Sequence, residues 1–86
     1  MYTRADFGNE LKERVTKKQN VAEIAEWADS VYLEHVEDID LDPEFRNILF
    51  ILNFMDVDPK AEFSHERLNE MADDLIAGKK NINMDY

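Results

Sequence analysis

Apolar residues recur at helical spacing through residues 21–35, and this periodicity sets the fold class. Steps of three and four residues place these side chains on one face of a helix. The face comprises Val21, Ile24, Ala25, Ala28, Val31, Tyr32 and His35. Asn20 precedes it and suits an N-cap, because its side chain can accept a hydrogen bond from the first turn. The segment predicts an amphipathic helix that begins at Val21.

Two further helices are predicted on either side of this one. Thr3 can cap a helix that runs to about Lys18 with one apolar face, which Gly8 weakens slightly. That face carries Phe7, Leu11 and Val15. Asp42 and Pro43 mark the start of the next helix, since proline favours the first helical position. Its residues 45–55 are apolar on most of the circumference, which predicts a place in the middle of the bundle.

A loop and a last helix complete the pattern. Residues 56–59, Asp-Val-Asp-Pro, favour a turn. Ser64 can cap a helix that Gly78 closes in the left-handed conformation. Its inward face would consist of Leu68, Met71, Ala72, Leu75 and Ile76. We expect the tail, residues 79–86, to fray.

The chain therefore predicts an all-α fold, a compact bundle of about four short helices. No strand pattern or internal repeat is present. With 86 residues the chain has room for one core, so residues 1–86 form a single domain. Cysteine is absent, which excludes disulfides and thiolate metal sites. No segment predicts a membrane span or a signal peptide, and we expect a cytoplasmic protein.

Charge is distributed unevenly along the chain. The net charge is −10, from 10 basic and 20 acidic residues. Residues 21–76 alone carry sixteen acidic and three basic side chains, whereas residues 1–20 carry five basic and three acidic ones. Such a field repels phosphate backbones and anionic lipids and attracts cationic surfaces. Direct binding to nucleic acid or to a membrane is therefore disfavoured.

Motifs for catalysis or for cofactors are incomplete. The spacing of the aspartates at 38, 40 and 42 resembles the start of a calcium loop, but Pro43 and Leu49 occupy the positions of its glycine and glutamate. Glu62 and His65 form a single Glu-x-x-His unit, and a di-iron bundle needs two. His35 lies on the apolar face, where a histidine at the edge of the core is the ordinary interpretation. We expect no metal, no cofactor and no enzymatic activity.

Acidic residues and one tryptophan are the candidate partner contacts. They are Trp27, Glu34, Glu37, Asp38, Asp40, Asp42, Asp56 and Asp58. Two interpretations of the acids stay open: a solvated surface with helix caps, or a binding surface for a basic partner. Trp27 falls off the main apolar face of its helix, which suggests either an interface anchor or packing against the first helix.

A family resemblance adds to this picture. The run Val21-Ala22-Glu23-Ile24-Ala25-Glu26-Trp27-Ala28, the acidic stretch to Asp42, the apolar helix to Leu52 and the last helix are similar to small helical immunity proteins of bacterial toxin–immunity systems, including contact-dependent growth inhibition. The similarity covers about residues 20–76. It implies a cytosolic, non-catalytic protein that neutralises a cognate toxin domain, often a basic nuclease, by covering it with acidic residues.

Two functions follow as hypotheses. The first is an immunity protein in a one-to-one complex with a basic nuclease toxin. The alternative is a non-catalytic regulatory or adaptor module, with or without homodimer formation, that buries Trp27 and apolar edge residues against another helix. Binding that weakens as salt rises favours the first, and concentration-dependent self-association favours the second.

Overall fold

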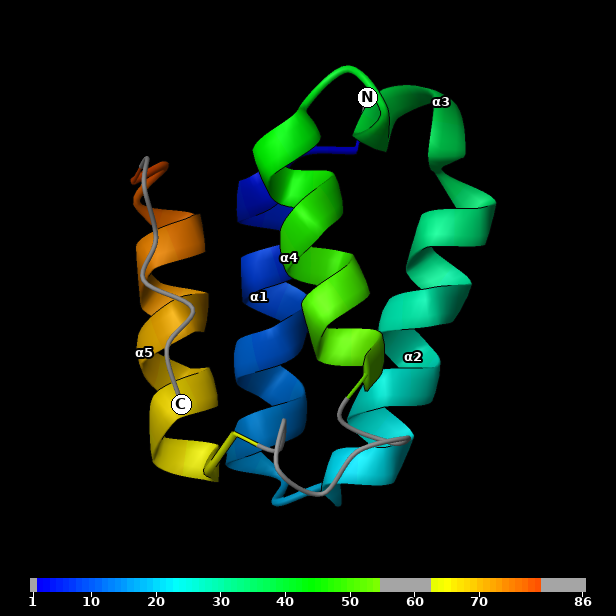
Figure 1. Ribbon diagram of the computed structural model, residues 1–86. Coiled ribbons are helices and arrows are strands. Elements are labelled where there is room, and N and C mark those ends of the chain that lie inside the picture. The colour runs from blue at the N-terminus through cyan, green and yellow to red at the C-terminus, as the bar shows by residue number, and fades with distance from the viewer. Residues whose placement is uncertain (1, 55–62, 80–86) are drawn as a thin grey trace.

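A computed structural model of the chain describes residues 2–54 and 63–79 (Figure 1). These residues form helices and connecting turns with no strand among them, which confirms the predicted all-α class. The helices are α1 (Arg4–Thr16), α2 (Val21–Glu34), α3 (Val36–Ile39), α4 (Pro43–Asn53) and α5 (His65–Ile76).

The predicted helix starts are all confirmed by capping bonds. Thr3 accepts from the Asp6 amide in a capping box, and Asn20 accepts from the Glu23 amide. Asp42 and Ser64 cap α4 and α5 in the same way, so each helix begins where a side-chain acceptor satisfies its first amides. Gly78 has φ +72° and closes α5, as expected.

The acidic stretch between α2 and α4 was not predicted to be helical, yet it contains the one-turn helix α3. Ile39 is fully buried, and its burial holds this turn against the core. Lys79 also differs from expectation: its amide donates to the Asp74 carbonyl at 3.0 Å, so it belongs to the ordered end of α5 and is not frayed. Residues 80–86 of the predicted tail lie outside the described residues.

Helix α1 has neighbours on three sides, and α4, which the sequence predicted in the middle of the bundle, lies against α1, α2 and α3. The Phe7 ring on α1 lies 4.6 Å from that of Trp27 on α2 and 5.5 Å from that of Phe45 on α4. On the side towards α5, α1 presents Gly8 instead of a side chain, which allows the two helices to pack closely side by side (Figure 1). Helix α4 packs mainly on α2 and leaves Phe50 and Phe54 40% and 59% exposed.

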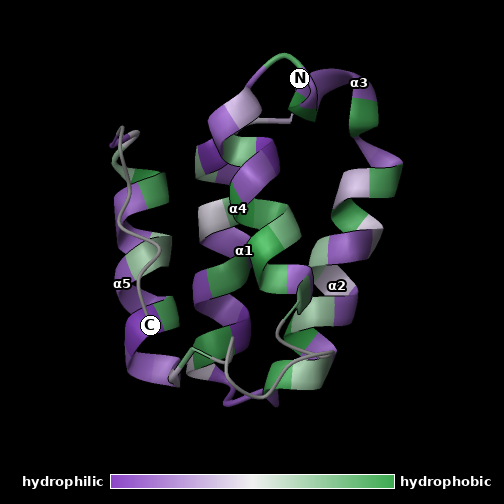
Figure 2. Cartoon of the chain, in the orientation of Figure 1, coloured by the Kyte–Doolittle hydropathy of each residue, from purple (hydrophilic) through white to green (hydrophobic). Residues whose placement is uncertain are grey.

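The core is apolar throughout the described residues. Each of the four longer helices buries three or more side chains, and Phe63 joins them from the segment before α5. Among these residues no polar or charged residue is buried. Figure 2 shows the hydrophilic residues alternating with apolar ones along α1, α2 and α5 and hydrophobic residues dominating the C-terminal half of α4.

Candidate functional site: an acidic corner

Five of the acidic side chains predicted as contacts lie where α2, α3 and α4 meet. We call Glu34, Glu37, Asp38, Asp40 and Asp42 the acidic corner. The whole unit from residue 20 to residue 54 contains nine acidic side chains and one basic one, Arg46. Because α2 contains no lysine or arginine, the negative charge of the molecule concentrates on this half.

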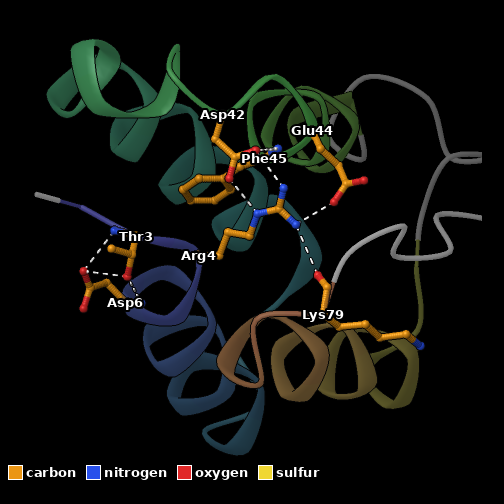
Figure 3. Close-up of polar contacts among 7 residues, drawn as sticks. All are labelled: Thr3, Arg4, Asp6, Asp42, Glu44, Phe45 and Lys79. Atoms are coloured by element: carbon orange, nitrogen blue, oxygen red, sulfur yellow. Dashed lines mark hydrogen bonds and ion pairs between the residues drawn. The ribbon is translucent and has the colours of Figure 1, made fainter.

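Asp42 ties the corner to the rest of the bundle. Its carboxylate caps α4 and accepts two hydrogen bonds from Arg4, at 2.6 Å from Nε and 2.7 Å from Nη2 (Figure 3). Nη1 of Arg4 also donates to Glu44 at 2.5 Å and to the Lys79 carbonyl at 3.2 Å. The hydrogen bonds to Asp42 and Glu44 raise the pKa of Arg4 despite its burial. Asp42 is thus a structural residue as well as an acidic one.

Asp38 holds the N-terminal segment. Its carboxylate accepts a hydrogen bond from the Tyr2 amide at 2.9 Å, and the Tyr2 ring stacks on His35 with the ring centres 4.2 Å apart. The Tyr2 hydroxyl donates to Glu10 on α1. His35 therefore has the ordinary structural role that the sequence suggested, and Tyr2 links α1 to α3.

Asp40 lies between an aromatic and a basic neighbour. It accepts a hydrogen bond from the Tyr32 hydroxyl at 3.1 Å, and its carboxylate is 3.8 Å from the Arg46 guanidinium. Desolvation and then this hydrogen bond raise the pKa of Tyr32. The ion pair with Arg46 is long and solvent-accessible, so it contributes little stability.

Glu34 and Glu37 are the acids of the corner that form no hydrogen bond or ion pair with a described side chain. Both are exposed, and no cation of residues 2–54 and 63–79 lies within ion-pair distance of either. With His35, Val36 and Asp38 they line a hollow of about 240 Å³. Their charges are therefore available to a partner.

Trp27 packs against the first helix, which is the second of the two interpretations left open. Its ring stacks on Phe7 at an interplanar angle of 7°, and the Arg14 guanidinium lies 4.5 Å from its centre. These contacts engage the indole in the α1–α2 interface, so we leave Trp27 out of the proposed contact surface. Asp56 and Asp58, the remaining predicted contacts, lie outside the described residues.

Aromatic side chains at the surface of α2 and α4 were not among the predicted contacts. The Tyr32 ring meets Phe50 edge-on, with centres 4.9 Å apart, and Phe54 follows Phe50 by one helical turn. A helical wheel separates residues 46, 50 and 54 from the buried positions 45, 48, 49 and 52. That separation was the available signal, and it was hidden by the overall apolar character of the segment.

The described part of the chain contains no group of three His, Cys, Asp or Glu side chains arranged to hold a metal ion. His65 lies with Nε2 2.7 Å from the Gln19 carbonyl, and Glu62 of the same motif is outside the described residues. None of the helices described is both long and apolar enough to cross a membrane. Comparison with protein-family models, curated proteins and solved structures found no match to this chain.

Proposed function

We propose that this protein binds a basic protein domain through its acidic corner and neutralises it in the cytoplasm, as an immunity protein does for a toxic nuclease. The observation that carries the proposal is the pair Glu34 and Glu37, which are exposed and have no cation among the described residues. A nuclease domain must present lysine and arginine to bind phosphate, and carboxylates on a rigid surface can occupy the same cleft.

Rigidity of the corner supports a binding role. The turn that carries Glu37 is fixed by buried Ile39, by the Asp38 bond to Tyr2 and by the Arg4 contacts of Asp42. A preorganised surface loses less conformational entropy on binding than a mobile one does. The local excess of acid also raises the association rate with a cationic partner.

The test uses three tagged proteins as baits at low salt, in extracts of the cells that produce the chain. They are the wild type, a double variant with Glu34→Gln and Glu37→Gln, and a control double variant with Glu66→Gln and Glu70→Gln on α5. Both variants change the net charge equally, so they separate the position of the charge from its amount. Glu66 and Glu70 are exposed, like the corner pair.

We expect the wild type and the α5 control to retain a basic protein at a one-to-one ratio, which salt releases and which degrades nucleic acid once freed. The corner variant should retain much less of it. Adding the wild-type protein back should inhibit the freed nuclease. Equal capture by all three baits, or no basic protein at all, would contradict the proposal.

A regulatory or adaptor module that self-associates is the second candidate, and exposed apolar side chains favour it. Leu33 and Leu41 are 68% and 72% exposed, in addition to the aromatic residues of α4. Sedimentation at increasing concentration separates the two candidates. A mass that rises from monomer to dimer supports self-association, and a constant monomer mass supports the immunity function.

A further inference from the structure

Three aromatic residues, half-buried Tyr32 on α2, exposed Phe50 on α4 and exposed Phe54 at the C-cap of α4, make up what we call the aromatic patch. Tyr32 contacts Phe50 edge-on at 4.9 Å, while Phe50 and Phe54 are 40% and 59% exposed. Phenylalanines four residues apart share one helix face. Single exposed apolar residues are common, but adjoining aromatic rings on one face are typical of binding surfaces.

The aromatic patch is directly joined to the acidic corner. The Tyr32 hydroxyl donates to Asp40, and Asp40 in turn lies 3.8 Å from Arg46, one turn before Phe50 on α4. Asp40 and Arg46 keep 46% and 38% of their side chains exposed. A carboxylate in such a weak, solvated ion pair remains able to accept a further cation.

The negative charge around the aromatic patch indicates which kind of partner binds it. A second copy of the chain would bring another net charge of −10 against a half of the molecule that already carries nine acids and one base. Like-charge repulsion therefore disfavours a homodimer through this face, whereas a cationic segment is attracted to it.

We infer that the aromatic patch is the docking surface for a segment of the basic partner that presents an apolar side chain beside a lysine or arginine. The apolar side chain packs against Phe50 and Phe54, and the cation pairs with Asp40. This inference rests on the proposed function for the charge of the partner and adds where its anchoring side chain binds. Acidic residues then set the association rate, and the aromatic contact slows dissociation.

The test measures binding of three synthetic helical peptides of equal length to the full chain, by amide chemical shifts. The first peptide has leucines on one face and lysines on the other. The second has glutamate in place of each lysine, and the third has serine in place of each leucine. The protein variants are Phe54→Ser and, as an equally exposed apolar control on α2, Leu33→Ser. Circular dichroism checks that each variant keeps its helices.

The leucine–lysine peptide should bind and shift the amides of Tyr32, Asp40, Phe50 and Phe54 most. Phe54→Ser should weaken its binding by about tenfold, because a central aromatic anchor is lost. Leu33→Ser should bind like the wild type. The glutamate and serine peptides should bind much more weakly than the leucine–lysine peptide.

Other outcomes separate this inference from the proposed function. In one outcome, salt weakens the binding of the two lysine-containing peptides but Phe54→Ser does not change their affinity. That outcome would overturn the docking surface and leave the acidic corner as the binding site. Equal binding of the glutamate peptide would overturn both, since the face would then not select cations. No binding by any of the three peptides would overturn the docking surface.

Discussion

Gly8 allows α1 and α5 to pack more closely than side chains would permit. A Cβ atom at this position would lie 2.8 Å from the Ala72 carbonyl oxygen and 2.9 Å from the Leu75 Cβ. Contacts of this length with backbone cannot be relieved by rotating a side chain. The helix-weakening glycine noted in the sequence is thus explained by packing between helices that are far apart along the chain.

The substitution Gly8→Ala should destabilise the protein by about 1–3 kcal/mol, because overpacking outweighs the gain in helix propensity of about 1 kcal/mol. Urea denaturation measures the free energy of unfolding. Gly78→Ala is the control: it meets open space and loses only the left-handed backbone preference of glycine. A Gly8→Ala protein more stable than the wild type would show that α1 and α5 do not pack this closely.

Tyr2 makes stability sensitive to alkaline pH. Burial, followed by the hydrogen bond to Glu10, raises the pKa of Tyr2 far above its ordinary value of 10.0. The folded state therefore holds this proton at a pH where the unfolded chain releases it. The resulting stability is present below pH 10 and is lost as pH rises above about 10.

The wild type should lose more stability between about pH 9 and pH 11 than the Tyr2→Phe variant, in which this hydroxyl no longer titrates. Urea midpoints at several pH values measure the difference. Because the two proteins differ only in the hydroxyl of residue 2, the comparison isolates Tyr2. Equal losses in the two proteins would contradict the assigned role of its hydroxyl.

At the scale of an element, a single left-handed residue after each of α1 and α5 affects the stability of the helix end. Just beyond the C-cap of α1, Lys18 has φ +57°; its amide donates to the Val15 carbonyl, and the Gln19 amide donates to the Arg14 carbonyl. Helix α5 ends in the same bonding pattern with Gly78 in the corresponding place. Lysine pays a steric cost in this conformation that glycine avoids.

Lys18→Gly should stabilise the protein by about 0.5–1 kcal/mol, since relief of the steric cost exceeds the extra entropy of glycine in the unfolded chain. Thermal and urea unfolding measure the change. Lys17→Gly is the matched control, because Lys17 has a right-handed conformation at φ −79° and gains nothing from glycine. A decrease in stability for Lys18→Gly would refute the left-handed ending.

Arg4 joins three helix ends, and its removal should affect them together. Its side chain is 14% exposed, and it bonds to Asp42, Glu44 and the Lys79 carbonyl. Arg4→Met should cost about 2–4 kcal/mol of unfolding free energy because two carboxylates lose their partly buried cation. Hydrogen exchange should also quicken at the N-terminus of α4.

Two variants separate the parts of this network. Asp42→Asn retains an N-cap acceptor and removes the charge, so it should cost less than Arg4→Met. Lys17→Met breaks an exposed pair with Glu13 and should leave the free energy of unfolding nearly unchanged. Equal effects of Arg4→Met and Lys17→Met would mean that the Arg4 cluster does not stabilise the bundle.

Across the whole molecule, local signals in the sequence predicted the fold class and the helix starts well, and the contacts between helices less well. Thr3, Asn20, Asp42 and Ser64 mark helix starts because caps are local, and the sequence identified each of them. The close contact at Gly8 depends on which helices meet, which periodicity does not specify. The turn at α3 was missed because four residues around Ile39 are too few for a helical repeat.

The candidate site was predicted in part. Glu34 and Glu37 have no ion-pair partner among residues 2–54 and 63–79, whereas Asp38, Asp40 and Asp42 each make a contact within the chain that spacing alone did not reveal. The stacking of Trp27 on Phe7 joins two helices, and the spacing of residues along α2 does not specify which helix lies there. The total charge was visible in the sequence, but the pairing of Asp42 with Arg4, 38 residues away, was not.

The central claim is that carboxylates of the acidic corner bind a basic partner. The most direct measurement is the dissociation constant of the captured basic protein at ionic strengths from about 50 mM to about 300 mM, for the wild type and for the Glu34→Gln, Glu37→Gln variant. We predict that wild-type affinity falls steeply with salt and that the variant binds more weakly with a shallower dependence. Equal affinities and equal salt dependence for the two proteins would contradict the claim.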